Sequence, residues 1–593
     1  MILSIFYVLS AIMIVGTLFF LPKSEEKQEG IIWLPVCYIA YECIISLAAS
    51  IFTIVHIPAN LLTIGIMNLL IGIAGVLWIK KNGNIQKYYF KIENVVFLFA
   101  MIVMVAVIAF ERYGNGFLIC FETSDPGTHL KLAMDTINSQ SVRNQTMYVG
   151  PFTNGMFIGT LSPVFNGVNV YKSFIIKEVI NFGLSGVIFY SCIYKFLGTR
   201  FFKFMGMGIT LFYLLGYPYS NMLFGFSYLG LGVSIIAFIL FLVDFYLEQQ
   251  ENQHILLFLI SLGCFGVAGC YTLFAPVVFV AVFICIAYKN KCMCGKVILS
   301  KQFYFKELQV FLIPTLLTLW YTIIYPRIID SETAIEYGSA LNIEGYIYRN
   351  LYSDFLIWLP LAVYAIYSHI YKKRKLTLTS ILFLVMILYA AVLFKGMYSG
   401  IVSTYYYYKL NFVIWLLVLV LFVEGISILA VNNKGFVLAY CGCWGTVFLL
   451  WFFGTDMHLY NKNVLFNPFP NAKCFFEIYD YNRTVRERKT TISTGLVELC
   501  KEVDKHYKDS EQVTMFMGNW LDNYWYEALT NQRQNGEYFH YNPSYYIQNF
   551  INGMYGNYLA VAKNEETFIE FYPLIQDFTV VYENEYGFII KHE

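Results

Sequence analysis

The sequence predicts a mainly α-helical protein: a polytopic transmembrane bundle of about 12–14 helices, followed by a small extracytoplasmic α/β domain at the C-terminus. Hydrophobic residues make up 58% of the 593-residue chain, charged residues only 13%, and mean hydropathy is +0.57. A soluble protein carries about 25% charged residues, so this composition is typical of a membrane protein. Aromatic residues, at 19%, suit two membrane–water interfaces. The net charge of +1 gives no indication of a nucleic-acid partner.

Hydropathy divides the first 454 residues into apolar runs separated by polar loops. A run of about 20 apolar residues is long enough to cross a bilayer as a helix. We therefore expect spans near 2–21, 31–54, 60–79, 95–110, 177–197, 203–219, 223–247, 255–269, 271–288, 308–326, 351–371, 377–397, 409–431 and 435–454.

Clusters of lysine and arginine predict the orientation, because short loops rich in these residues stay in the cytoplasm. The clusters lie near 80–91, 195–203, 289–306 and 372–375. We expect a multi-pass protein of the plasma membrane. The segments expected on its outer face are 111–176, 327–350, 398–408 and everything after 455.

The tail from 455 to 593 is expected to form the extracytoplasmic domain, and residues 1–454 the membrane domain. About 140 residues are enough to bury a core. Helical spacing covers 494–508, and strand-like patterns cover 513–517, 579–582 and 586–591. Trp520, Trp525 and Tyr526 are expected in the core of this domain or on a sugar-facing patch, and the core is favoured.

The most unusual segment is 121–130, which reads Phe-Glu-Thr-Ser-Asp-Pro-Gly-Thr-His-Leu directly after a long apolar run. Ionisable residues at a membrane edge are costly and often functional. Glu122, Asp125 and His129 are therefore candidate catalytic residues, with Asp125 as a general base for a hydroxyl group. An Asp followed by Pro is also a good helix start, so capping is an alternative explanation. The three side chains could instead hold a divalent cation, but no fixed metal-ligand spacing supports a metal site.

The outer segment 111–176 is expected to contain a short amphipathic helix. Leu130, Met134 and Ile137 share one helical face, while Lys131 lies elsewhere. This pattern predicts a helix that lies on the outer membrane surface.

Cations near the outer face are candidates for binding a lipid phosphate. Lys395 and Lys409 bracket the segment 396–408. Arg327 and Arg349 are further candidates, because a guanidinium group binds phosphate bidentately. A lysine at a helix end can equally reach the membrane interface with no further role.

Four consecutive tyrosines precede Lys409. Tyr405, Tyr406 and Tyr408 are candidate sugar-facing residues, because aromatic faces suit sugar rings. The same residues could instead belong to an interfacial aromatic belt.

Many spans with cytoplasmic basic loops, an acidic motif in a long outer loop and an outer C-terminal domain together resemble the GT-C superfamily of membrane glycosyltransferases. The local match is Glu122-Thr-Ser-Asp125, at the position of the family's acidic site in the first outer loop. The family often has two acids that are adjacent or one residue apart, whereas here the nearest acid is three residues before Asp125. The resemblance implies transfer of a sugar from a polyprenyl-phosphate-linked donor to a glycan or glycolipid acceptor, with Asp125 as the base.

Three other functions remain open from the sequence. A polysaccharide polymerase or ligase would depend on outer-loop arginines more than on an acid. A transporter or flippase of lipid-linked glycans would favour inverted repeats and ionisable residues at mid-membrane. A non-catalytic scaffold with an outer sensor domain is the last alternative.

Overall fold

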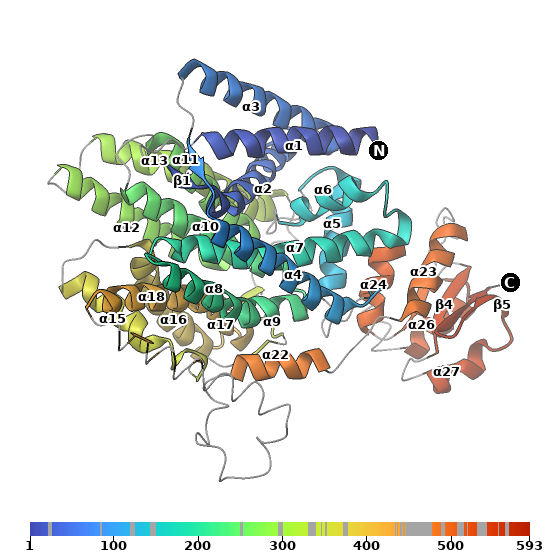
Figure 1. The fold of residues 1–593 in the computed structure, drawn as a ribbon. Helices are drawn as coiled ribbons and strands as arrows, with labels where there is room; N and C mark the ends of the chain where they lie inside the picture. Colours follow the sequence, from blue (N-terminus) through green and yellow to red (C-terminus); the bar gives the residue numbers. More distant parts are fainter. Residues whose placement is uncertain are drawn as a thin grey trace, which may run out of the picture.

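The computed structural model is a largely helical molecule with a small sheet near its C-terminus (Figure 1). The residues that it describes are 1–21, 27–82, 86–118, 125–142, 150–248, 253–294, 301–329, 340–345, 347–349, 353–371, 377–432, isolated positions between 435 and 445, 477–487, 493–506, 515–518, 520–530, 543–554, 557–563 and 568–592.

The predicted helix bundle is confirmed. Ten helices of the described residues are long and apolar enough to cross a membrane. Every predicted span from 2–21 to 409–431 contains an α-helix, although the span predicted at 351–371 is α-helical only from Leu359, and the span predicted at 435–454 lies largely outside the described residues. The longer helices are α1 (Ile2–Phe20), α2 (Gly30–Ile54), α3 (Leu61–Asn82), α4 (Ile92–Tyr113), α7 (Val170–Tyr194), α8 (Arg200–Leu215), α10 (Ser227–Glu248), α11 (Gln253–Cys270), α12 (Ala275–Cys294), α13 (Lys301–Leu319), α15 (Leu359–Tyr371), α16 (Leu378–Tyr398) and α18 (Leu410–Asn432).

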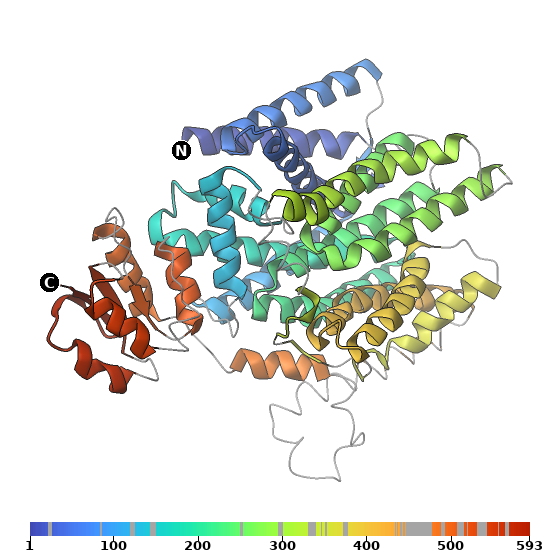
Figure 2. The same cartoon turned by 180° about the vertical axis from the view of Figure 1, so that it is seen from behind.

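Helices α10 and α18 form the centre of the bundle, and α1, α3 and α4 lie at its edge (Figures 1 and 2). In the apolar stretch of α10, 89% of the residues are buried, against 28% in α3. The apolar side chains that α1, α3 and α4 expose are those expected of helices that face lipid. Short helices complete the bundle: α5 (Asp125–Ser139), α6 (Gly150–Leu161), α9 (Tyr217–Phe224) and α17 (Thr404–Tyr408).

A buried ion pair corrects the predicted start of one span. Helix α7 begins at Val170, not near 177, so Lys177 lies about two turns inside it. The Lys177 ammonium pairs with the Glu42 carboxylate of α2, and it also donates to the Tyr38 hydroxyl at 3.0 Å. Both members of the ion pair are at least 95% buried. Hydropathy missed this part of the helix because a hydropathy scale gives a lysine the same value whether it is buried in an ion pair or exposed to water.

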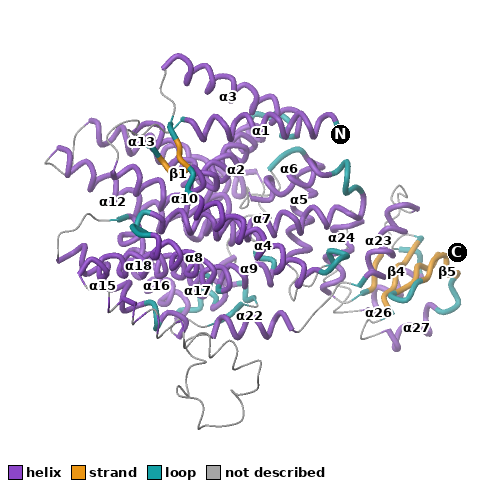
Figure 3. Tube along the Cα trace, viewed as in Figure 1, coloured by secondary structure: helices purple, strands orange, loops and turns teal. Residues whose placement is uncertain are grey.

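The C-terminal region contains a four-stranded sheet of order β3-β4-β6-β5 (Figure 3). Strand β3 runs parallel to β4, while β6 is antiparallel to both β4 and β5. The strands predicted at 513–517, 579–582 and 586–591 are confirmed, and a further strand lies between the first two. The strands are β3 (Met515–Met517), β4 (Tyr558–Ala562), β5 (Thr579–Glu583) and β6 (Gly587–Lys591).

Helices cover both faces of this sheet, and successive side chains of each strand point alternately toward one face and the other. Ala560 and Ile589 face one core with α23 (Thr494–His506) and α24 (Trp520–Thr530). Leu559 and Ile590 face a second core with α26 (Pro543–Ile551) and α27 (Phe568–Ile575). The alternation follows from the two-residue period of a strand. Trp525 and Tyr526, at 2% and 0% exposure, belong to the first core, as predicted, and the helix predicted at 494–508 is α23.

The first of these cores is shared with the bundle. Leu130 of α5 and Phe174 of α7 are fully buried in it. Helix α5 packs between α6 and α24, as both views show (Figures 1 and 2). The expectation that the apolar face of α5 lies on the membrane surface is therefore wrong, because that face packs against protein. The domain boundary expected near 455 lies outside the described residues.

Helix α22 (Glu477–Glu487), the first described helix of the tail, packs against the bundle. The Asn482 amide donates to the carbonyls of Leu215 and Gly216, at 2.8 and 2.7 Å, where α8 ends. The Ile478 N–H donates to the buried Asp354 carboxylate at 3.2 Å. The two Asn482 bonds satisfy carbonyl groups that a helix C-terminus leaves without partners.

Candidate functional site

A tight corner positions the first turn of α5 against the bundle. Helix α9 ends at Gly225, whose φ of +68° lies in the left-handed region. A Cβ atom at this position would lie 2.1 Å from Cγ of Pro126. Only glycine fits both the conformation and the contact. We call the turn between α9 and α10 (Gly225–Ser227) the glycine corner. Pro126, the residue after Asp125, is held against it.

His129 also binds the glycine corner. Its Nδ1 atom lies 3.0 Å from the Gly225 carbonyl oxygen, and its ring packs on Tyr228 with centroids 4.2 Å apart. A carbonyl only accepts, so Nδ1 carries the proton and Nε2 is left as an acceptor. Burial lowers the pKa of the imidazole; Asp125 and the bond to Gly225 oppose this change, and Lys409 adds to it. His129 is therefore a neutral residue that positions α5.

Lys409 lies between α17 and α18 and is enclosed by aromatic rings. Its Nζ atom is 3.7 Å from the centre of the Tyr405 ring, 5.1 Å from Tyr271 and Tyr406, and 5.3 Å from Phe226. We call this group the lysine cage. Lys409 is 6% exposed, and within the described part of the chain it makes no ion pair. Ring faces are attractive to a cation, most strongly where water is excluded.

Asp125 lies close enough to the lysine cage to interact with it. Its carboxylate interacts electrostatically with Lys409, Tyr406 and His129. The side chain is partly exposed, and it accepts no hydrogen bond from another described residue. Asp125 is itself the first residue of α5, where a negative charge interacts favourably with the helix dipole and stabilises the helix. The structure thus brings together the predicted base and one predicted cation from segments almost 300 residues apart.

The other predicted cations do not join this group. The Lys395 side chain is exposed in the last turn of α16. Arg349 bonds to Glu344 at 3.1 Å, to the Gly345 carbonyl at 2.8 Å and to Thr404 at 2.9 Å. This guanidinium therefore secures the start of α17, which carries two rings of the lysine cage.

Two predicted site residues cannot be placed. Glu122 lies outside the described residues, and so does the side chain of Arg327. Among the described residues, no group of three His, Cys, Asp or Glu side chains could hold a metal ion. A divalent cation at Glu122, Asp125 and His129 stays untested.

The predicted sugar-facing tyrosines differ in their surroundings. Tyr405 and Tyr406 face the Lys409 ammonium. Tyr408 is partly buried against the bundle core. Its ring packs edge-on against the Tyr407 ring, with 5.4 Å between the ring centroids. Their role toward a sugar remains a prediction.

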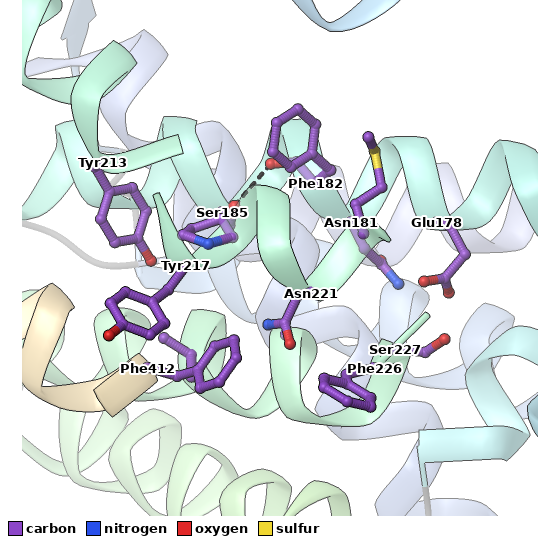
Figure 4. Close-up of a pocket in the computed structure, with 14 residues that line it drawn as sticks. Glu178, Asn181, Phe182, Ser185, Tyr213, Tyr217, Asn221, Phe226, Ser227 and Phe412 are labelled. Atoms are coloured by element: carbon purple, nitrogen blue, oxygen red, sulfur yellow. Dashed lines mark hydrogen bonds between the residues drawn. The ribbon is translucent and has the colours of Figure 1, made fainter. Parts of the chain in front are cut away.

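A small cavity with a mostly apolar wall lies beside the lysine cage within the bundle (Figure 4). Its volume of about 30 Å³ has room for a couple of water molecules, and Phe226 contributes to both its wall and the cage. Glu178 and Asn181 of α7 and Asn221 of α9 provide polar groups, and Figure 4 also shows the rings of Phe182, Phe226 and Phe412 on the wall.

Sequence reasoning missed Gly225, Phe226, Tyr271 and Glu178. Aromatic residues inside apolar runs are typical of a core, so nothing marked Phe226 or Tyr271. The interruption of the apolar pattern at Gly225 was an available signal, since an isolated glycine often marks a helix end.

Fold and site together define a multi-pass membrane protein with a carboxylate and a caged lysine at one end of its bundle. No family model and no curated protein matches the chain. Solved structures similar to it include an oligosaccharyltransferase from Archaeoglobus fulgidus, in complex with Zn and sulfate, at 10% identity and a TM-score of 0.42 over 78% of this chain and 68% of that one. ArnT from Cupriavidus metallidurans is similar at 11% identity over 84% of this chain and 97% of its own, with TM-scores of 0.42 bound to undecaprenyl phosphate and 0.41 in the apo state. These values are too low to transfer any residue role.

Proposed function

We propose that this protein is a membrane glycosyltransferase that moves a sugar from a polyprenyl-phosphate donor to a glycan or glycolipid acceptor. The observation that carries the proposal is that Asp125 and Lys409 lie on the same corner of the bundle, since Pro126 packs on Gly225 and the Lys409 ammonium lies 5.3 Å from the Phe226 ring, so that the two charges interact. One group can accept a proton and the other can stabilise phosphate charge, and both are needed for this transfer. The sugar donor resembles the lipid that the similar ArnT structure contains in its bound state.

The proposed reaction is a single displacement. The acceptor hydroxyl oxygen attacks the anomeric carbon and gives its proton to the Asp125 carboxylate. The bond between the anomeric carbon and the phosphate oxygen breaks, and its electron pair stays on the phosphate. The products are the glycosylated acceptor, with inverted configuration, and polyprenyl phosphate. Lys409 would stabilise the negative charge that grows on the leaving phosphate.

We further propose that the end of the bundle carrying α5 and the lysine cage is extracytoplasmic. The basic clusters support this orientation. Lys195, Arg200 and Lys203 lie where α7 ends and α8 begins, which is the opposite end of these helices from Val170. Short basic loops stay in the cytoplasm.

The test is release of polyprenyl phosphate from a radiolabelled polyprenyl-phosphate hexose in membrane vesicles that contain their natural acceptors. Loss of a general base lowers the rate by about 10²–10⁴-fold, so the release rate of Asp125→Asn should be at least about 10²-fold below that of wild type. Asp135→Asn, on the same helix, is the matched control and should keep the wild-type rate. Equal rates for wild type and Asp125→Asn would remove Asp125 as the base.

A transporter of lipid-linked glycans is the second candidate, favoured by the buried Lys177–Glu42 pair within the bundle. The same assay separates the two. A transporter moves the lipid with its sugar still attached, so no polyprenyl phosphate is released by any variant.

A further inference from the structure

A pair of lysines lies at the end of the bundle opposite to the lysine cage. Lys91 precedes α4 as its N-cap residue, and Lys203 is in the first turn of α8. Both helices pack against α7, whose last residue is Tyr194. The Tyr194 hydroxyl accepts from the Asn94 amide of α4 at 3.3 Å, and its ring centre lies 5.5 Å from the Lys203 Nζ atom. The end of α7 therefore holds the starts of α4 and α8 close together.

The side-chain nitrogens of Lys91 and Lys203 lie within hydrogen-bonding reach of each other. Both are donors, so two charged ammonium groups in this position repel each other and cannot bond directly. Lys203 is buried, and neither lysine forms an ion pair with another described residue. An anion placed between the two nitrogens would accept from both and replace this repulsion with attraction.

The acidic groups near the two lysines leave one positive charge unbalanced. The Glu93 carboxylate, which interacts with Lys203, is already paired with Arg200 at 2.9 Å. The Glu29 carboxylate accepts from the backbone N–H of Lys91 at 3.1 Å, and it interacts electrostatically with both lysines. Two ammonium groups thus face one unpaired carboxylate. A phosphodiester carries a single negative charge and its oxygens only accept hydrogen bonds, so it matches both the charge and the donors.

Exposed apolar side chains lie beside the lysine pair. Four apolar residues within two positions of either lysine are more than half exposed: Phe90, Ile92, Phe201 and Phe204. Apolar and aromatic side chains next to lysines at the ends of membrane helices mark the boundary between acyl chains and head groups. A lipid bound here would place its phosphate at the lysines and its acyl chains against these side chains.

We propose that Lys91 and Lys203 bind the phosphate group of an anionic phospholipid. Each ammonium donates to a different phosphate oxygen, so the lipid bridges the starts of α4 and α8. Basic pockets between membrane helices bind head groups of this kind. The site lies at the opposite end of the bundle from Lys409, so this inference does not rest on the proposed function.

The experiment measures lipid binding by native mass spectrometry of full-length protein in detergent. Wild type should bind phosphatidylglycerol more tightly than phosphatidylcholine, because the choline group cancels the phosphate charge. Lys91→Gln and Lys203→Gln should each raise the Kd for phosphatidylglycerol about tenfold, the effect of one hydrogen bond to a charged group. Without anionic lipid, the Tm of both variants should equal or exceed that of wild type, because each removes the contact between like charges.

Lys81→Gln is the matched control, since Lys81 is exposed in the last turn of α3 and is not part of the pair. It should keep the wild-type Kd. Inorganic phosphate, which has no acyl chains, should compete with the lipid only weakly, and competition at equal concentration would assign the pair to a free phosphate instead. An unchanged Kd in both variants of the pair, an equal loss in Lys81→Gln, or no preference of wild type for phosphatidylglycerol overturns the lipid site.

Discussion

The Nζ atom of Lys409 lies 3.7 Å from the centre of the Tyr405 ring, and the Lys409 N–H donates to the Tyr405 carbonyl at 3.2 Å. The tyrosine run thus both starts the turn that positions this lysine and provides the ring under its charge. Thr404, at the start of the same turn, is held by Glu344 and Arg349. The position of the ammonium therefore depends on a hydrogen-bonded loop as well as on the rings.

Replacing the Tyr405 ring should weaken binding of a lipid phosphate. A desolvated cation–π contact contributes about 2 kcal/mol, so Tyr405→Leu should raise the Kd for polyprenyl phosphate about tenfold or more. Tyr405→Phe keeps a ring and should stay near wild type. Tyr407→Leu, a buried neighbour whose ring faces Phe394, is the control. An equal Kd for Tyr405→Leu and wild type would show that the ring does not position Lys409.

Gly225→Ala should displace α5 from the bundle. The new Cβ would lie 2.1 Å from Pro126 Cγ, and φ is +68°, so strain of about 1–3 kcal/mol is expected. Thermal unfolding in detergent should show a lower Tm, and hydrogen exchange should rise in α5. Gly198→Ala is the control, because nothing lies within 4 Å of its Cβ position. Unchanged exchange in α5 would contradict this account of the glycine corner.

Much of the bundle could be predicted because a long apolar run has few alternatives to a membrane helix. Strand β4, with the sequence Tyr-Leu-Ala-Val-Ala, was missed because five apolar residues fit a strand or a buried helix equally. The start of α7 was missed because the partner of Lys177 is 135 residues away.

The candidate site was predictable only in part. Asp125 and Lys409 are charges beside apolar runs, so each attracts attention by itself. Phe226 and Tyr271 have a role only through their distance to Lys409, which no local pattern contains. The surface-helix prediction for α5 failed for a related reason, because an amphipathic pattern does not distinguish a lipid surface from a protein partner.

Stability of the folded protein should depend on pH through His129. Burial lowers the pKa of His129 below its usual 6.5, so the folded state favours the neutral ring. The stability that neutral His129 contributes is fully present above the pKa that this histidine has in the unfolded chain. It is lost as the pH falls through the lower pKa that His129 has in the folded protein. The wild-type Tm should therefore fall between pH 7 and pH 5 more steeply than that of His129→Asn, which keeps a donor for the Gly225 carbonyl. Parallel Tm curves for the two proteins would exclude His129 as the source.

Docking of the C-terminal domain on α5 should depend on close packing more than on charge. A Cβ at Gly127 would lie 2.9 Å from Cβ of Tyr524 and 3.1 Å from its backbone carbon, so Gly127→Ala forces two helices apart. Overpacking of this kind costs about 1–3 kcal/mol. The Lys131 side chain, which pairs with Glu527, is 35% exposed. Lys131→Ala should therefore lower the free energy of unfolding by at most about 1 kcal/mol.

Hydrogen exchange of α24 in full-length protein checks this difference. Gly127→Ala should raise exchange in α24 and α5 together, because the two helices share one core. Lys131→Ala should change exchange little, and its small effect should shrink further in high salt, which screens exposed charges. A larger effect for Lys131→Ala than for Gly127→Ala would show that charge, rather than the shared core, holds the domain on the bundle.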